Sequence, residues 1–568
     1  MARRPSARHR YARRSMSVDA GATLVVRGLT IGHDPVVLAE GIDLVVAPGH
    51  VIGLVGPNGA GKTTLLKTLA GVITRSGGSV SAAPPAATIG YLPQDVHADA
   101  PFGETVAAFL LRRTGVGEAE RAMEEGATAL AAGTDGADQR YADALERWLA
   151  LGGADFEPRA AAVRSELGLD VDDAQPVSSL SGGQAGRLGL ASLLLARFDV
   201  FLLDEPTNNL DLDGLRRLEQ LMTELRVPVV VVSHDRAFLE STATEIFELD
   251  PLERRGTLFG GGYRAYLDER EIARLHAQSA FDDYTETRDD LLDRARTVRN
   301  WTYQGVKKAK GKKPDSDKIG AKKRAESSEK MAGKASRLEH AAERLDVVVE
   351  PRKVWQLQYT IASAGRSGAL VASLRDAVVE RDRFRLGPVD LDVHTGDRIV
   401  ITGPNGGGKS TLLHALLAET ALTAGTRRAG TGVAVGSLDQ ARMRFDGAAT
   451  LLDAIRVELP TLTLPEIRTL LAKFGLGADD VHRPATSLSP GERTRAVLAL
   501  FQARGVNCLV LDEPTNHLDL PAIEQLEQAL QVYEATLLLV THDRRMLETV
   551  AVNRRLQVIA GQVTELDV

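Results

Sequence analysis

Two glycine-rich segments of the sequence each end in a lysine and a hydroxyl residue. They read GPNGAGKT over residues 56–63 and GPNGGGKS over residues 403–410. Each follows an apolar, strand-like run and precedes a run with helical character. In that context the backbone N–H groups of the loop surround phosphate oxygens, the lysine reaches the outer phosphates and the hydroxyl binds Mg²⁺. The sequence therefore predicts two nucleoside triphosphate sites. Their candidate phosphate-loop residues are Gly56, Pro57, Asn58, Gly59, Ala60, Gly61, Lys62, Thr63 and Thr64, and Gly403, Pro404, Asn405, Gly406, Gly407, Gly408, Lys409, Ser410 and Thr411.

Carboxylates and a histidine follow apolar strands downstream of each glycine loop. The segments VFLLDEPTNNLD and CLVLDEPTNHLD place an aspartate and a glutamate together at a strand end. Hydrolysis of a phosphoanhydride needs clamped phosphates and an oriented water. We assign the aspartates to Mg²⁺, the glutamates to the water and the histidines to the γ-phosphate, although a single histidine at a strand end is more often a packing residue. The candidate catalytic residues are Glu205, Glu513, His234 and His542, and the candidate metal-binding residues are Thr63, Gln94, Asp204, Ser410, Gln440 and Asp512.

These motifs occur in the same order in both halves of the chain. The spacing is 308 residues for Ser181/Ser489, Asp204/Asp512, Glu205/Glu513 and His234/His542, 347 for Lys62/Lys409 and 346 for Gln94/Gln440. The first copy therefore carries about 38 additional residues between Gln94 and Ser181. A duplicated domain with one local insertion explains this pattern.

The full motif set, with LSGGQ at residues 180–184 and LSPGE at residues 488–492, resembles that of tandem ABC-type ATPases. The DEPTNHLD segment and a charged segment between the halves resemble the ABC-F family of translation factors and antibiotic-resistance proteins, and in particular its actinobacterial resistance members. The resemblance implies an α/β fold with two tandem ABC-type P-loop nucleotide-binding domains joined by a long basic α-helical hairpin. It also implies hydrolysis of ATP to ADP and phosphate, with ATP and Mg²⁺ as cofactors.

The resemblance further implies that two ATP molecules are held head to tail within a monomer, each between one phosphate loop and the opposite signature. The candidate signature residues for ATP are Ser181, Gly182, Gly183 and Gln184, and Ser489, Gly491 and Glu492. Pro490 stands where the first signature glycine is expected, which removes a backbone donor but suits a helix start. We therefore expect unequal but competent sites. For the aromatic platform expected under adenine, Phe384 is the candidate in the second half and His33 in the first, with ordinary surface residues as the alternative.

The domain boundaries follow from composition and from the repeat. We expect a disordered basic tail at residues 1–21, with Met16 as an alternative start, and an ATPase domain at 22–267 with a helical arm at about 116–163. A helical hairpin with a basic tip is expected at 268–350, and the second ATPase domain at 351–568. In the related family the arm position touches the exit-site region of the ribosome, whereas the alternative is simple decoration.

Composition excludes several classes of protein. No apolar run approaches the 18 residues of a membrane span, and the single cysteine, Cys508, rules out an internal disulfide and fits a cytoplasmic location. Residues 299–337 contain 13 Lys or Arg and 4 Asp or Glu, while the whole chain has a net charge of −7. A polyanionic partner should therefore meet this segment first.

The basic segment lacks interleaved aromatic residues, which suits contact with a phosphate backbone more than base readout, although a basic linker exposed to solvent would look similar. By the family resemblance the hairpin enters the ribosomal exit site and acts on the P-site tRNA and the peptidyl-transferase centre, so the partners are ribosomal RNA and tRNA. Protection of the ribosome from antibiotics is the favoured role. The alternatives are a housekeeping translation factor, the ATP-binding subunit of a macrolide-type drug exporter, and a DNA-handling ATPase. The candidate RNA-binding residues of the tip are Lys307, Lys308, Lys310, Lys312, Lys313, Lys318, Lys322, Lys323 and Arg324.

Overall fold

A computed structural model describes most of the chain, namely residues 21–33, 36–208, 210–251, 253–310, 330, 333–334, 336–341, 343–345, 369–381, 384–438, 445, 449–516 and 518–567. The side chains of His33, Pro490 and residues 301–310 lie outside this description. So do the basic tail at residues 1–20, Gln440, and the predicted RNA-binding residues between 312 and 324. Only the backbone is described for Lys307, Lys308 and Lys310. The chain divides into two compact units, Met1–Tyr263 with Gln356–Val568, and Arg264–Trp355.

The first half of the first unit is built around a six-stranded sheet. Its order is β5 (Ile89–Leu92), β6 (Val200–Asp204), β7 (Val229–Val232), β3 (Val51–Val55), β8 (Glu245–Asp250) and β9 (Arg255–Gly260), and β8 pairs with β9 antiparallel while the other pairs are parallel. Every residue of β3, β6 and β7 is buried, as expected for parallel strands covered on both faces. The carboxyl ends of β3, β6 and β7 therefore meet at one edge of the sheet, where ligands bind in such folds.

The second half repeats this sheet. Its order is β14 (Val435–Ser437), β15 (Cys508–Asp512), β16 (Thr536–Val540), β12 (Arg398–Thr402), β17 (Arg554–Ile559) and β18 (Gln562–Leu566), again with one antiparallel pair at the β18 edge. Helices α1 (Lys62–Leu69) and α12 (Lys409–Leu417) follow β3 and β12, each directly after a glycine loop. The predicted strand, loop and helix context of both loops is confirmed.

Each half also has a three-stranded antiparallel sheet. The orders are β2 (Val36–Val46), β1 (Thr23–His33), β4 (Gly77–Ala83) in the first half and β11 (Phe384–His394), β10 (Leu370–Arg381), β13 (Ala424–Ala429) in the second. These sheets pack on α1 and α12 through the buried apolar faces of their strands. They thereby bring the first residues of β2 and β11 close to the phosphate loops.

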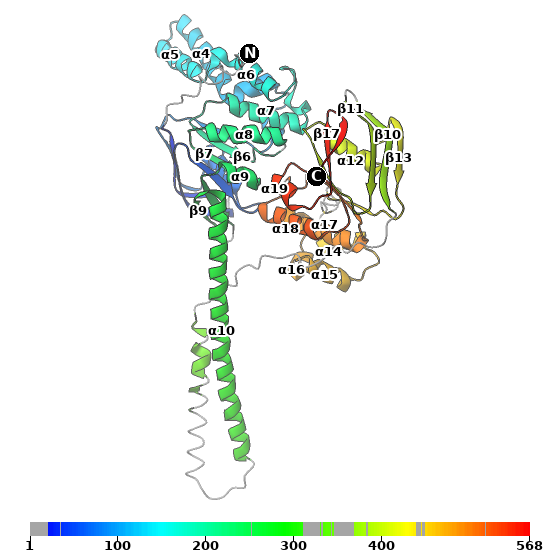
Figure 1. Ribbon diagram of the computed structural model, residues 1–568. Helices are drawn as coiled ribbons and strands as arrows, with labels where there is room; N and C mark the ends of the chain where they lie inside the picture. Colours follow the sequence, from blue (N-terminus) through cyan, green and yellow to red (C-terminus); the bar gives the residue numbers. More distant parts are fainter. Residues whose placement is uncertain are drawn as a thin grey trace, which may run out of the picture. The chain divides into compact units, whose positions relative to one another are not determined.

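Helices on one side of each large sheet carry the signature segments. In the first half they are α2 (Val96–Asp99), α3 (Val106–Thr114), α4 (Val116–Ala131), α5 (Ala137–Ala150), α6 (Phe156–Glu166) and α7 (Gly182–Leu195). In the second half they are α14 (Leu451–Glu458), α15 (Leu464–Lys473), α16 (Ala478–Val481) and α17 (Pro490–Arg504). Short 3-10 turns lie at Gly153–Asp155 and Val177–Ser179 in the first half and at Ala485–Ser487 in the second. Helices α4 and α5 lie side by side in the segment predicted as an inserted arm (Figure 1).

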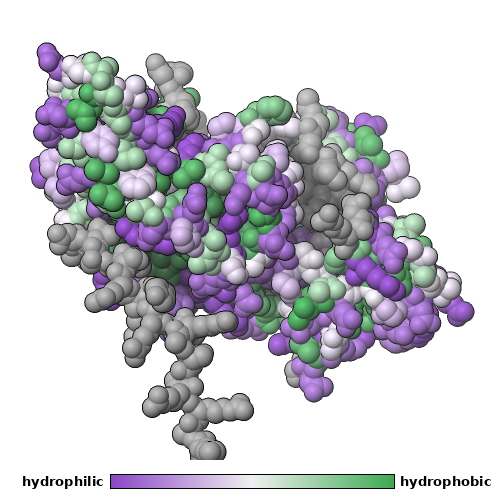
Figure 2. All heavy atoms as spheres, turned by 90° about the horizontal axis from the view of Figure 1, so that it is seen from above, coloured by the Kyte–Doolittle hydropathy of each residue, from purple (hydrophilic) through white to green (hydrophobic). Residues whose placement is uncertain are grey.

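Four helices follow the strands that end in the candidate carboxylates and histidines. They are α8 (Leu212–Glu224), α9 (Arg236–Thr242), α18 (Leu520–Val532) and α19 (Arg544–Thr549). Apolar faces of α8 and α18 join the cores of their own halves. On the face of the molecule in Figure 2, hydrophilic and apolar residues are intermixed over the described parts.

Most of the described part of the second unit is one long helix, α10 (Gly262–Lys310), of 49 residues. Its side chains between 269 and 280 are almost all exposed, and ion pairs such as Arg274 with Glu271 at 2.7 Å run along its surface. Arg299 Nη2 lies 2.8 Å from Glu339 Oε2 of the following helical segment. This ion pair links α10 to that segment. None of the described helices is both long enough and apolar enough to cross a membrane.

Candidate active site

The two glycine loops hold their lysines in the same way. Gly61 and Gly408 adopt positive φ angles of 98° and 107°, and each caps the helix that begins with the lysine. Lys62 Nζ donates to the carbonyl oxygens of Gly56 at 2.7 Å and Pro57 at 3.1 Å. Lys409 Nζ donates to those of Gly403 at 2.9 Å and Pro404 at 3.3 Å. Burial lowers the pKa of both lysines, so an anion beside them would offset the burial of their charge.

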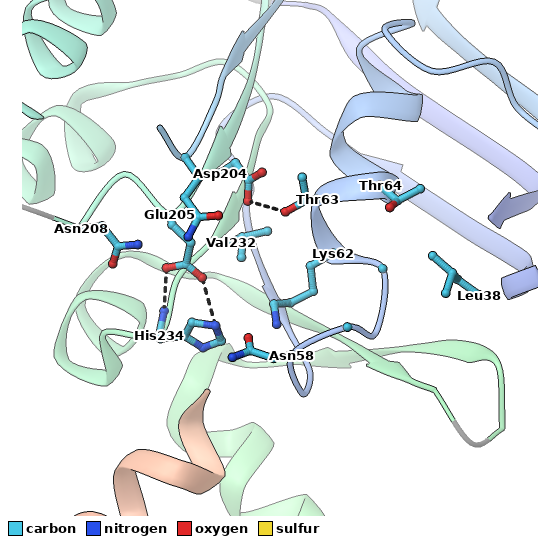
Figure 3. Close-up of a pocket in the computed structure, with 13 residues that line it drawn as sticks. Leu38, Asn58, Lys62, Thr63, Thr64, Asp204, Glu205, Asn208, Val232 and His234 are labelled. Atoms are coloured by element: carbon cyan, nitrogen blue, oxygen red, sulfur yellow. Dashed lines mark hydrogen bonds and ion pairs between the residues drawn. The ribbon is translucent and has the colours of Figure 1, made fainter. Parts of the chain in front are cut away.

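The first site gathers oxygen ligands at the end of β6. Thr63 Oγ1 donates to Asp204 Oδ1 at 3.2 Å (Figure 3). Tyr91 Oη donates to Asp204 Oδ2 at 3.2 Å. Gln94 lines a cavity together with Thr63 and Asp204. A hydroxyl, a carboxylate and an amide oxygen are ligands of the kind that Mg²⁺ prefers. The predicted metal-binding residues of the first half thus fit a magnesium ion.

The next residue, Glu205, faces His234 across the cavity. Glu205 Oε2 accepts a hydrogen bond from the backbone N–H of His234 at 3.3 Å, and its Oε1 lies 3.2 Å from Nε2 of the imidazole (Figure 3). Burial raises the pKa of Glu205 and lowers that of His234 to about 3. Glu205 also holds a left-handed φ of 50°, a strained conformation for this residue that clusters at functional sites.

The second site repeats this pair with a more exposed glutamate. Glu513 has a φ of 47°, and its Oε1 lies 3.2 Å from His542 Nε2. The Glu513 side chain is 24% exposed, whereas that of Glu205 is 5% exposed. Burial raises the pKa of Glu513 to about 7 and lowers that of His542 to about 4. Lys409 Nζ also lies 2.9 Å from His542 Nε2. No hydrogen bond joins Ser410 to Asp512 among the described contacts, and Gln440 lies outside the described residues.

Two cavities mark the sites. The first, of about 340 Å³, is lined by Asn58, Lys62, Asp204, Glu205 and His234 with their neighbours, all from the first half. The second, of about 260 Å³, lies between the halves of the first unit. Its lining combines the signature residues Ser181, Gly182 and Gly183 with Asn405, Gly406, Glu513 and His542. A Cβ on Gly183 would lie 2.7 Å from that of Asn405, so this signature abuts the opposite phosphate loop. Ser489 and Gly491 do not line the first cavity.

Both signatures begin a helix with the same capping box. Ser181 caps α7, where its backbone N–H donates to Gln184 Oε1 at 2.8 Å. Ser489 caps α17, where its N–H donates to Glu492 Oε2 at 2.7 Å. Pro490 occupies the first position of α17, where a missing N–H is tolerated. Glu492 therefore makes in the second half the same cap that Gln184 makes in the first.

Sequence reasoning missed the side chain that faces the first phosphate loop. Phe384 Cζ lies 2.6 Å from the position that a Cβ on Gly408 would take. The matching atom in the first half is Leu38 Cδ1, 3.2 Å from the Cβ position of Gly61, and Leu38 lines the first cavity. Leu38 precedes Phe384 by 346 residues, the Gln94/Gln440 spacing, so the repeat offset could have found it. His33 ends β1, and its side chain is not described.

Comparison with known proteins agrees with this geometry. A family model described as "ABC transporter" matches residues 39–208 and 386–516. Tylosin resistance ATP-binding protein TlrC of Streptomyces fradiae is 34% identical over 94% of this chain and 96% of its own length. ABC transporter F family member 5 of Arabidopsis thaliana is 30% identical over 91% of this chain and 72% of its own length. The energy-dependent translational throttle protein EttA of Mycobacterium tuberculosis is 29% identical over 91% and 88%.

The fold and the two sites define an ATPase of the ABC class, which binds and hydrolyses ATP. Within that class the chain belongs to the ABC-F family and resembles its antibiotic-resistance members. A solved structure titled RNase-L Inhibitor has a TM-score of 0.55 at 20% identity and covers 95% of this chain and 90% of its own. That likeness concerns the fold alone. The predicted family, the tandem α/β architecture with a long helical linker, and the ATPase activity are all confirmed.

Proposed function

We propose that this ABC-F ATPase binds the ribosome at its exit site and protects it from an antibiotic. In this proposal the ATP-bound chain inserts the basic tip of its linker toward the P-site tRNA and the peptidyl-transferase centre, and hydrolysis withdraws it. The observation that carries the proposal is the match to the tylosin resistance protein along 94% of this chain, which includes the linker. The cytoplasm, where ribosomes translate, is the proposed location.

The charge of the linker supports a nucleic-acid partner. Nine of the 18 residues between 307 and 324 are basic and two are acidic, in a chain of net charge −7. Helix α10 extends from Gly262 to Lys310 and so leads into this segment. A long helix that ends in clustered lysines suits contact with an RNA backbone.

We assign the chemistry of each site to the residues that the structure brings together. Lys62 and Lys409 would bind the outer phosphates of ATP, and Glu205 and Glu513 would orient the attacking water. The Oε1 atom of each glutamate is buried and accepts no hydrogen bond from the described residues, although a histidine Nε2 lies 3.2 Å away. A water placed beside each Oε1 would supply the missing hydrogen bond. His234 and His542, neutral near pH 7, would donate to the γ-phosphate.

Thr63, Gln94 and Asp204 would hold Mg²⁺ in the first site, and Ser410, Gln440 and Asp512 in the second. The ion would neutralise charge on the β- and γ-phosphates. The burial of Asp204, which raises the pKa of this carboxylic acid, favours a nearby cation in the same way.

We expect the two sites to differ in how strongly they bind the base. Phe384 offers an aromatic face beside its phosphate loop, whereas Leu38 offers a smaller aliphatic surface. Stacking of a base on an aromatic ring contributes about 1–3 kcal/mol. In a Lys409→Ala background, which silences the second site, Leu38→Phe should tighten binding of a ribose-labelled fluorescent ATP by about 5-fold or more. In a Lys62→Ala background, Phe384→Leu should weaken it by a similar factor.

Inorganic tripolyphosphate is the control ligand for this experiment, because it lacks a base. Its affinity should not change with either substitution. Equal effects on tripolyphosphate and ATP would show that Leu38 and Phe384 only support the loop and do not contact adenine.

Translation in a purified bacterial system tests the proposed function. Addition of the protein with ATP should restore synthesis that tylosin has inhibited, and should leave uninhibited synthesis unchanged. Restoration should fail with a variant that carries Lys62→Ala and Lys409→Ala. A protein that instead slows synthesis in an ATP-dependent way without the drug would favour a translation factor of the EttA kind. Efflux of the drug only when a membrane partner is supplied would favour the exporter role.

A further inference from the structure

Helices α8 and α18 are each anchored by their first turn to the opposite half of the first unit. Asp519, the N-cap of α18, accepts a hydrogen bond from the backbone N–H of Asn58 at 3.0 Å. Asp211, the N-cap of α8, accepts one from the N–H of Asn405 at 3.1 Å. Each helix therefore begins on the phosphate loop of the opposite ATP site.

A second anchor lies two turns further along each helix. Glu527 of α18 forms an ion pair with Arg236, and Glu219 of α8 accepts from Arg544 at 2.8 and 3.1 Å. We call Arg236–Glu527 and Arg544–Glu219 the cross-half pairs. They occupy equivalent positions, because the repeat spacing of 308 residues relates both the arginines and the glutamates.

The arginines of the cross-half pairs stand close to the candidate γ-phosphate sensors. Arg236 is the first residue of α9 and lies two residues after His234, and Arg544 is the first residue of α19 and lies two residues after His542. Helices α9 and α19 also contact one another. Helix α18 is thus attached to the first site at both its phosphate loop and its histidine segment, and α8 is attached to the second site in the same way.

Each helix also continues from the catalytic segment of its own half. Glu513 stands at the start of the loop that leads into α18, and Glu205 stands at the start of the loop that leads into α8. A rigid helix that follows one site's glutamate and is fixed at two points on the other site has the geometry to transmit movement between the sites. A single anchor would allow the helix to pivot, whereas two anchors about two turns apart fix its direction.

We propose that Arg236, Glu527, Arg544 and Glu219 are positioning residues that couple the two ATP sites. In this arrangement each cross-half pair holds the histidine segment of one site against the helix that follows the glutamate of the other. ATP bound in one site then favours the positions of the histidine segment and the glutamate that hydrolysis in the other site requires. The inference rests on the proposed ATP sites but does not depend on the ribosome as partner.

The two pairs differ in burial, which sets the order of the experiment. The Arg236 and Glu527 side chains are 3% and 7% exposed, whereas those of Arg544 and Glu219 are 30% and 18% exposed. Loss of one partner from the buried pair would leave an uncompensated charge inside the protein and threatens folding. The less buried pair, Arg544–Glu219, is therefore tested first.

The test measures steady-state hydrolysis against ATP concentration for Arg544→Glu, Glu219→Arg and the double variant that exchanges the charges. The parent protein should show a Hill coefficient above 1, up to a limit of 2 for two coupled sites. Each single variant should bring the coefficient to about 1 and lower kcat by roughly 5-fold or more. The exchanged pair should restore at least half of both losses. Arg216→Glu is the matched control, since Arg216 pairs with Asp213 on α8 at 3.1 Å while 70% exposed, and it should change neither quantity.

The neutral variants Arg236→Gln and Glu527→Gln then test the buried pair, with thermal unfolding to confirm that the protein is folded. A larger loss of cooperativity is expected than at the less buried Arg544–Glu219 pair. A parent with a Hill coefficient of 1, or variants that keep the parent's cooperativity, would overturn the coupling. Failure of the parent and variants to bind fluorescent ATP would instead overturn the proposed sites themselves.

Discussion

Replacement of both Glu205 and Glu513 by glutamine is expected to lower steady-state ATP hydrolysis by at least about 100-fold while ATP binding persists. Loss of a group that accepts a proton from the attacking water removes a contribution of that size. Both glutamates adopt a strained left-handed conformation, and an oxygen of each lies 3.2 Å from a histidine nitrogen. Glutamine has the same shape, so it can occupy the same position without the negative charge. Phosphate release and binding of fluorescent ATP measure the two effects separately.

Glu224→Gln serves as a control, because this glutamate ends α8 and accepts only from Gln220 Nε2 at 2.8 Å among the described contacts. Its hydrolysis rate should equal that of the parent. The single variants Glu205→Gln and Glu513→Gln should differ from one another in single-turnover rate, because the two carboxylates differ in exposure and only Glu513 shares its cavity with signature residues. Equal rates would contradict the proposed inequality of the sites.

Neutralisation of the linker tip should produce the other large effect. Replacement of the eight lysines between 307 and 323 by glutamine is expected to weaken ribosome binding by at least about 100-fold at 0.1 M salt, and to flatten its salt dependence. The reason is that each lysine paired with a phosphate releases a counterion on binding. Binding curves at several salt concentrations give both quantities.

The matched control replaces the same eight lysines by arginine, which keeps the charge. That variant should bind as the parent does. If the glutamine variant bound ribosomes with the parent's affinity and salt slope, the tip would not be the RNA contact, and the linker would act as a spacer only.

The repeated motifs predicted much of the fold and the core of each site, because each lies within a short stretch of chain. The glycine loop, its lysine and the helix that follows are set by neighbouring residues, and α1 and α12 begin at Lys62 and Lys409 as expected. The carboxylates at the ends of β6 and β15 follow from the rule that parallel strands gather their ends at one edge.

Features that depend on contacts between distant segments could not be predicted in this way. Arg236 and Glu527 are 291 residues apart, and neither has a local pattern that names its partner. Leu38 was not predicted because the expected platform is aromatic, whereas the structure places this aliphatic side chain beside Gly61. The left-handed conformations of Glu205 and Glu513 likewise arise from the surrounding sheet and not from residue preference.

Co-sedimentation with 70S ribosomes tests the central claim most directly. The measurement uses the Glu205→Gln/Glu513→Gln variant with ATP and with ADP, beside the same variant without residues 307–324. Both glutamates are replaced because one competent site could still reopen the ATP-bound form. We predict that the double variant pellets with ribosomes in ATP but not in ADP, and that removal of the basic segment abolishes pelleting. Absence of pelleting in both nucleotides, with ATP binding intact, would contradict the proposal that the protein acts on the ribosome.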